Sequence, residues 1–136
     1  MSALAYCFYC EQLFATLERQ RSGCWIQSYF MGLLGYSDDN ICLAPSLHAL
    51  QKMLKTCEDF AFSHNLKFST DPNPIKCKTK TMAFLKKPCD LPNLMLCENP
   101  LPWTDGCKHL GINLENIING CEHDMRTKNA QYIGNT

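Results

Sequence analysis

The spacing of apolar residues along the chain predicts two amphipathic helices. The first covers the range from Met1 to about Arg21, where apolar residues recur every three or four positions. The second begins after Pro45, with Ser46 as its N-cap. Its apolar face includes Leu50 and Leu54, which we expect to be buried. The opposite face carries Gln51, Lys52, Lys55 and Glu58. We expect both lysines on this face to be exposed.

Between these helices, two apolar runs flank a pair of adjacent carboxylates. We expect Asp38 and Asp39 to lie at the tip of an antiparallel hairpin formed by Leu33–Tyr36 and Ile41–Leu43. A plain turn would also explain the two aspartates, because Asp side chains bond to the local backbone and tolerate unusual dihedrals. The flanking residues are therefore needed to decide between a turn and a site.

Shorter patterns predict the remaining elements and the fold class. Strands are expected at residues 24–27, 29–36, 66–69, 76–84 and 107–114, a hairpin from 94–97 to 100–103, and a weak helix over 116–133. An irregular loop is expected around Pro72 and Pro74. Together these elements predict an α+β fold in which a small antiparallel sheet carries the amphipathic helices on one face.

Composition narrows the class of protein. The chain has 136 residues, enough for one modest domain, and a formal net charge of zero, which gives no general sign of nucleic-acid binding. We see no signal-peptide pattern and no apolar run of the ~18–20 residues that a membrane span needs. The ten cysteines are therefore expected to be reduced thiols in an intracellular compartment, the cytoplasm or the nucleus.

The cysteines also leave a zinc-binding or partner-binding module as an alternative. A structural zinc site needs two closely spaced cysteine pairs, or one pair with histidines. Only Cys7 and Cys10 are separated by two residues, and both fall in the first predicted helix. Cys107 and His109 are the nearest additional candidates.

A basic stretch stands out in this neutral chain. Residues 67–87 contain six lysines and a single acidic residue, Asp71. One interpretation is a solvated strand edge, where lysines discourage sheet-to-sheet aggregation. The other is contact with nucleic-acid phosphates by Lys76, Lys78, Lys80, Lys86 and Lys87.

The stretch Gly35-Tyr36-Ser37-Asp38-Asp39 resembles the Tyr-x-Asp-Asp motif of reverse transcriptases, with Ser37 in place of the commoner alanine. The resemblance continues through Cys24-Trp25-Ile26 and Gly32-Leu33 before the motif and through residues 43–46 after it, and it covers about residues 2–134. The family that it indicates is the reverse transcriptase of non-LTR (LINE-type) retrotransposons. It implies part of a polymerase palm at residues 1–115 and the start of the thumb at 116–136.

The resemblance implies RNA-directed DNA polymerase chemistry, in which two metal ions clamp the attacking and leaving oxygens of the transferred nucleotide. Asp38 and Asp39 would hold Mg²⁺ or Mn²⁺, with an RNA template and a DNA primer as partners. Either Lys76 or Lys78 would protonate the departing pyrophosphate, and the resemblance does not choose between them. Contact with nucleic acid is implied for Tyr36, Lys80, Lys86, Lys87, Lys108, His109 and Gly111.

Parts of the family pattern would lie before residue 1. These are a third catalytic aspartate, a Gln-Gly dipeptide that lines the nucleotide pocket, and the fingers. We therefore expect the chain to be a retroelement remnant that opens at an internal methionine and is inactive alone. A non-catalytic nucleic-acid-binding remnant is the alternative.

Overall fold

The computed structural model describes residues 3–85 and 89–116, without the side chains at positions 3–7 and 9. The chain divides into two compact units, each of which we describe by itself. The helical unit comprises Met1–Ser69 and Leu94–Asn99, and the loop unit comprises Thr70–Asn93 and Pro100–Thr136. The weak helix expected over residues 116–133 lies, apart from its first residue, outside the described residues.

Both amphipathic helices are present in the helical unit, so these two predictions are confirmed. Helix α1 spans Ala3–Gln20 and helix α2 spans Leu47–Ser63. Ser46 is the N-cap of α2 as predicted, because its hydroxyl accepts a hydrogen bond from the backbone N–H of Ala49 at 3.2 Å. The helix ends at Ser63, after which Asn65 takes a left-handed φ of 53°.

Four short strands lie between the helices as two antiparallel hairpins. Strand β1 (Trp25–Ile26) pairs with β2 (Tyr29–Phe30), and β3 (Leu33–Tyr36) pairs with β4 (Asp39–Cys42). The single strand expected over residues 29–36 is therefore wrong. Its backbone changes partner midway, because the N–H of Met31 bonds to Cys24 whereas the carbonyl of Gly32 bonds to Leu43.

Two glycines allow this change of partner. A Cβ atom at Gly32 would lie 2.4 Å from the ring of Phe30 and 2.8 Å from the Cα of Gly23. Real Cβ atoms do not approach other heavy atoms this closely. Gly23 and Gly32 therefore allow the two hairpins to meet backbone to backbone beneath the ring of Phe30.

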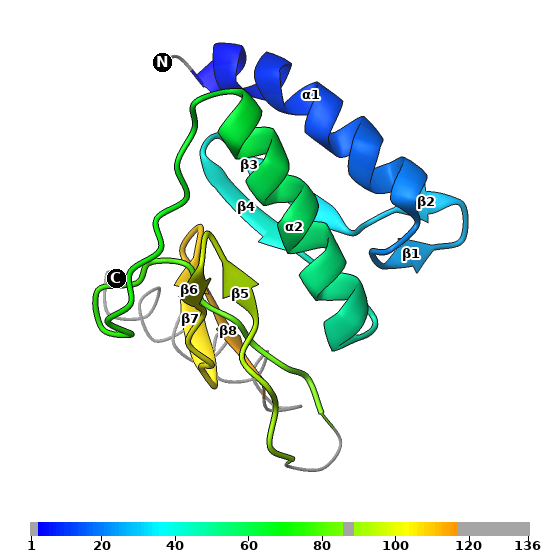
Figure 1. Cartoon of the computed structure of the whole chain (residues 1–136). Coiled ribbons are helices and arrows are strands. Elements are labelled where there is room, and N and C mark those ends of the chain that lie inside the picture. The colour runs from blue at the N-terminus through cyan, green and yellow to red at the C-terminus, as the bar shows by residue number, and fades with distance from the viewer. Residues whose placement is uncertain (1–2, 86–88, 117–136) are drawn as a thin grey trace, which may run out of the picture. The chain divides into compact units, whose positions relative to one another are not determined.

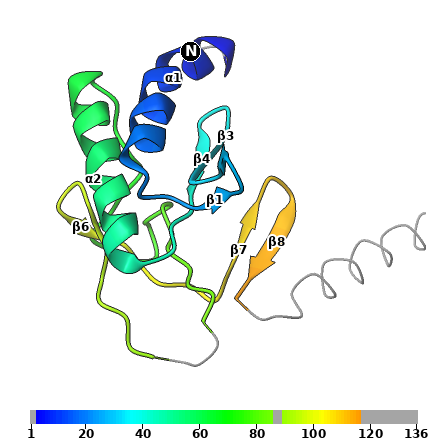
Figure 2. The ribbon, with the colours of Figure 1, turned by 90° about the vertical axis from the view of Figure 1, so that its right-hand side faces the viewer.

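The core of the helical unit lies between the helices and one face of the β3/β4 hairpin (Figure 1; Figure 2). Five buried residues form it: Leu13, Leu17, Leu33, Met53 and Cys57. Leu54 is buried and Lys52 and Lys55 are exposed, as predicted. The burial predicted for Leu50 is wrong, since this residue is only half-buried. The core contact of α2 begins one turn later, at Met53.

Two predicted strands do not form. Residues 66–69 contain no strand, and the N–H of Leu66 instead bonds back to Ala61 at the end of α2. Residues 76–84 contain only an isolated bridge from Thr81 to Trp103. In that stretch Cys77 and Thr81 are buried while Lys76, Lys78 and Lys80 are exposed, so the side chains alternate as in a strand, but the described residues supply no neighbouring strand to pair with it. At the start of this stretch, the N–H groups of residues 76 and 77 both donate to the carbonyl of residue 73, which forms a turn.

Two further hairpins follow. Strand β5 (Met95–Leu96) pairs with β6 (Asn99–Pro100), which confirms the predicted hairpin, with shorter strands. Strand β7 (Gly106–His109) pairs antiparallel with β8 (Ile112–Glu115), and Figure 2 shows them as a separate hairpin. The single strand expected over residues 107–114 is therefore wrong, because the chain reverses at residues 110 and 111, with φ of 49° and 80°.

The mixture of helices and short strands confirms the α+β class. The described strands pair as four two-stranded sheets, so the expectation of one small sheet is corrected. Local turn residues form each hairpin. No long alternating stretch joins the hairpins into one ladder.

Candidate functional site

The two adjacent carboxylates lie at the tip of the β3/β4 hairpin, as predicted. Tyr36 pairs with Asp39, so only Ser37 and Asp38 form the turn, and Ser37 takes a left-handed φ of 54°. Strand β4 therefore begins at Asp39, two residues earlier than expected. Both aspartates are exposed, and the side chain of Tyr36 is 66% exposed beside them.

The alternation of side chains along β3 sets the direction of this tip. Leu33 is buried in the core, whereas its neighbour Leu34 and Tyr36 are exposed. Gly35 lies against α1, because a Cβ at this position would be 3.2 Å from the ring of Phe14. One face of the hairpin thus packs on the helices, while the other presents Leu34 and Tyr36.

The carboxylate oxygens at the tip are of the type that binds a hard cation. Carboxylate oxygens are the ligands that Mg²⁺ prefers, and Asp38 and Asp39 supply them from adjacent positions. Within residues 3–85 and 89–116, no group of three or more His, Cys, Asp or Glu side chains is arranged to hold a metal ion. The two aspartates would therefore need further oxygen ligands, such as substrate phosphates or another carboxylate.

The cysteine-rich alternative gains no metal centre in the part of the chain that the structure describes. Cys10 is buried in the helical unit, and the side chain of Cys7 lies outside the described residues. Cys107 and His109 are both half-buried and lie two residues apart on β7. No third ligand joins them among the described side chains.

The basic stretch lies in the loop unit except for residues 67–69, whereas the hairpin tip lies in the helical unit. Lys76, Lys78 and Lys80 are exposed, and the ammonium of Lys80 donates to the carbonyl of Pro74 at 2.9 Å. Because residues 76–84 form no strand, the interpretation of these lysines as protection of a strand edge loses its basis. Lys86 and Lys87 lie outside the described residues.

The β7/β8 hairpin carries the last group of predicted contact residues. Lys108 is exposed, His109 is half-buried, and Gly111 is exposed in the turn with a φ of 80°. Open space surrounds the position where a Cβ of Gly111 would lie. The adjacent Leu110 and Ile112 are about half-exposed, an apolar feature of this turn that the sequence analysis did not predict.

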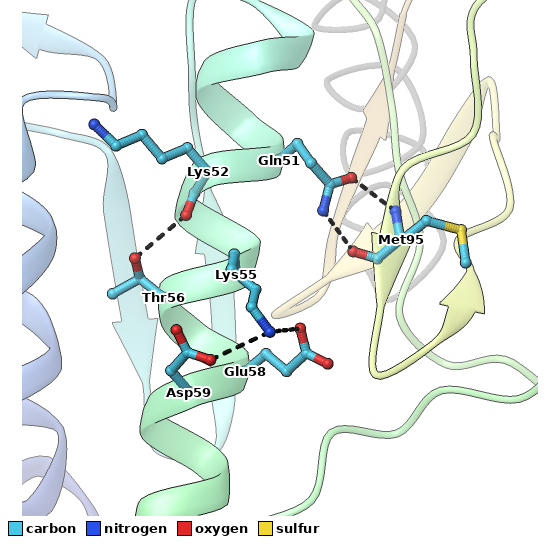
Figure 3. A network of polar contacts seen from close by, with 7 residues as sticks. All are labelled: Gln51, Lys52, Lys55, Thr56, Glu58, Asp59 and Met95. Carbon is cyan, nitrogen blue, oxygen red and sulfur yellow. Dashed lines mark hydrogen bonds and ion pairs between the residues drawn. The ribbon is translucent and has the colours of Figure 1, made fainter.

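Gln51 is a structural residue that the sequence analysis missed. Its side-chain amide donates to the carbonyl of Met95 at 2.9 Å and accepts from the N–H of the same residue at 2.8 Å (Figure 3). This pair of hydrogen bonds fixes strand β5 to helix α2. The partners are 44 residues apart, so no local signal could reveal the contact.

Lys55, on the exposed face of α2, has a shifted pKa. The ammonium of Lys55 forms ion pairs with Glu58 at 3.1 Å and Asp59 at 3.3 Å (Figure 3). Hydrogen bonds first to Glu58 and then to Asp59 raise the pKa of Lys55. The lysine is fully exposed, so these ion pairs lie on the surface of the helix and contribute little to stability.

The loop unit contains an open hollow of about 560 Å³. Trp103 lines it, together with Leu85, Leu91 and Asp105. The indole N–H of Trp103 donates to the carbonyl of Pro92 at 3.3 Å, so this half-buried side chain is partly fixed by its own unit. Among the described residues, none of those predicted to bind metal or nucleic acid lines the hollow.

Comparison with known proteins gives no match: no family model, no curated protein and no solved structure corresponds to this chain. None of the described helices combines the length and the apolar character needed to cross a membrane.

Proposed function

We propose that this chain is part of the palm of an RNA-directed DNA polymerase of the non-LTR retrotransposon type. The observation that carries the proposal is the exposed tip of the β3/β4 hairpin. There Tyr36, Asp38 and Asp39 lie together, as the resemblance to the Tyr-x-Asp-Asp motif requires. The packing of this hairpin against two helices supports the proposal, since a catalytic constellation needs rigid elements beneath it.

In this proposal the aspartates hold a divalent ion. The carboxylates of Asp38 and Asp39 would bind Mg²⁺, or Mn²⁺ in its place, and the ion would supply charge stabilisation to the reacting phosphate. Mg²⁺ is bound weakly by one or two carboxylates unless substrate phosphates add further ligands. A further carboxylate, which the described residues do not bring to this tip, would complete the set.

Basic residues would act on the substrate in this proposal. Lys76 or Lys78 would protonate the departing pyrophosphate, and both are exposed. An RNA template and a DNA primer would be contacted by Tyr36, Lys80, Lys86, Lys87, Lys108, His109 and Gly111. Lysine contacts of this kind position a strand without reading its sequence.

Primer extension on an RNA template tests the catalytic proposal. The chain by itself should give no measurable extension, because positioning by fingers and a third aspartate, which the described residues do not supply, is worth ~7–11 kcal/mol of barrier. That corresponds to at least ~10⁵-fold in rate. Adding a polypeptide that carries the fingers and the third aspartate should restore extension with Mg²⁺ or Mn²⁺.

The matched variants decide whether the tip is responsible. Asp38→Asn together with Asp39→Asn should abolish the restored extension. Glu98→Gln should leave it unchanged, because Glu98 is an exposed carboxylate in the turn of another hairpin of the same unit. Restored extension that survives the double substitution would refute the role of the tip, and extension by the chain alone would refute the need for an added polypeptide.

The alternative is a non-catalytic nucleic-acid-binding protein, and the exposed Lys76 and Lys78 on a segment without strand structure favour it. Binding to RNA should then weaken linearly with the logarithm of salt concentration, and each replaced contact lysine should lower the slope by about one. Lys52→Gln, on the exposed face of α2, is the control. Salt-dependent binding without restorable extension would favour this alternative.

A further inference from the structure

Two cysteine side chains meet inside the helical unit, where neither has a part in the proposed polymerase chemistry. Cys42 is the last residue of β4 and lies opposite Leu33, and Cys57 lies in α2. Cys57 belongs to the apolar core and Cys42 packs against that core. Both are free thiols, and they share a side-chain hydrogen bond.

We propose that Cys42 and Cys57 form a reversible disulfide when the protein is exposed to a peroxide, so that oxidation ties strand β4 covalently to helix α2. This inference goes beyond the proposed polymerase function and does not depend on it. It rests on two free thiols from different elements that pack in one apolar cluster, Cys57 within it and Cys42 against it.

The two sulfurs have different roles in this reaction. The hydrogen bond from Cys57 lowers the pKa of Cys42, against the opposing effect of burial. The same hydrogen bond, together with burial, raises the pKa of Cys57. Cys42 is also the more exposed of the two residues. Since the oxidant must reach the sulfur that attacks it, the more exposed Cys42 is the attacking thiol.

The reaction proceeds in two balanced steps. The Cys42 thiolate attacks one peroxide oxygen and breaks the O–O bond, which leaves Cys42 as a sulfenic acid and releases one water after proton uptake. The sulfur of Cys57 then attacks the Cys42 sulfur, the S–O bond breaks, and a second water leaves with the proton of Cys57. The two thiols together lose two electrons, and the peroxide gains them.

Cys10 is the competing partner. It is buried on α1, and its nearby charge also raises the pKa of Cys57. Cys10 affects the pKa of Cys57 through its charge alone, whereas Cys42 also shares a hydrogen bond with Cys57. We therefore expect oxidation to select Cys42 over Cys10.

Peptide mapping of the full chain tests the inference. The reduced protein, freed of reductant, is treated with one equivalent of hydrogen peroxide, and its remaining thiols are then alkylated in denaturant so that buried thiols are also blocked. Trypsin cleaves after Lys52 and Lys55, between the two cysteines, so a disulfide would appear as two linked peptides. We expect the Cys42–Cys57 pair to be the main linked product and to disappear after treatment with dithiothreitol.

Two matched variants complete the test. Cys42→Ser should lose the linked product, while Cys24→Ser should retain it, because Cys24 is a half-buried thiol of the same unit that has no part in the pair. A dominant Cys10–Cys57 link would overturn the assignment. Recovery of Cys42 and Cys57 as alkylated thiols, while exposed Cys89 is oxidised, would overturn the proposal itself.

Discussion

The helical unit and the loop unit are held together in different ways. In the helical unit, side chains from α1, β3 and α2 meet in one apolar cluster. In the loop unit, the clearest tie is a set of hydrogen bonds around Thr81, whose N–H and hydroxyl both donate to the carbonyl of Pro102. The carbonyl of Thr81 in turn accepts from the N–H of Thr104.

This difference decides how each unit should respond to substitution. Apolar burial stabilises in proportion to the area removed from water, so a cluster that is lost costs several kcal/mol. A hydrogen bond adds only about 1 kcal/mol net, because water would satisfy the same groups after unfolding. The two tryptophans report on the units separately, since Trp25 lies in the helical unit and Trp103 in the loop unit.

The largest effect is expected at the centre of the helical core. Leu17 is fully buried, so Leu17→Ala should reduce the free energy of unfolding by ~2–5 kcal/mol. Urea titration followed by Trp25 fluorescence in a Trp103→Phe background measures this loss. Phe62→Ala is the control, because Phe62 is 88% exposed on α2 and its truncation should change stability by less than ~0.5 kcal/mol. Equal effects of the two changes would show that the cluster is not the main source of stability.

A smaller effect is expected in the loop unit. Thr81→Val removes the hydroxyl that donates to the carbonyl of Pro102 at 2.9 Å and keeps the shape of the side chain. The expected loss is about 1 kcal/mol, measured by Trp103 fluorescence in a Trp25→Phe background. Thr104→Val removes an exposed hydrogen bond to Gly106 and should cost less. If Leu17→Ala shifted the Trp103 transition as much as the Trp25 transition, the two units would unfold as one.

The smallest effect is expected at the surface of α2. Lys55→Met removes both ion pairs, yet Lys55 is fully exposed, so little stability should be lost at neutral pH. The pKa of Lys55 is raised in the folded state. Its contribution is therefore fully present below the unfolded pKa and is lost as the pH rises through the folded pKa.

Paired urea titrations at neutral and at strongly alkaline pH measure that contribution. Lys52→Met is the control, because Lys52 forms no ion pair with the described residues. A difference between the two variants that grows with pH would contradict the assigned sign.

The helical unit was largely predictable from the sequence because its signals are local. Apolar spacing identified α1 and α2, and the cap at Ser46 follows from one residue and its position. The tip with Asp38 and Asp39 was also found, since apolar runs flank two turn-forming residues. Leu50 was misplaced because periodicity gives the direction of a face but not where along the helix its contacts begin.

The loop unit was less predictable because its order depends on distant partners. Residues 76–84 show alternation in sequence, yet the Thr81 backbone bonds to Pro102, which no periodicity can indicate. The hairpin turn at Leu110-Gly111 was read as a continuous strand, although Gly111 is the residue type that such a turn favours. The sequence identified the lysines of the basic stretch by residue type. The spacing of those lysines could not show what they contact.

The left-handed backbone of Ser37 restricts which sequences can occupy the hairpin tip. This conformation costs an L-residue ~1–2 kcal/mol and costs glycine almost nothing, whereas asparagine and aspartate tolerate it. Valine, isoleucine and threonine are disfavoured because their branched Cβ crowds the backbone. Substitutions at position 37 should therefore be limited by the shape of the turn, whether or not the neighbouring carboxylates are used. Sequence variation at the tip would then be restricted to residues that keep the hairpin.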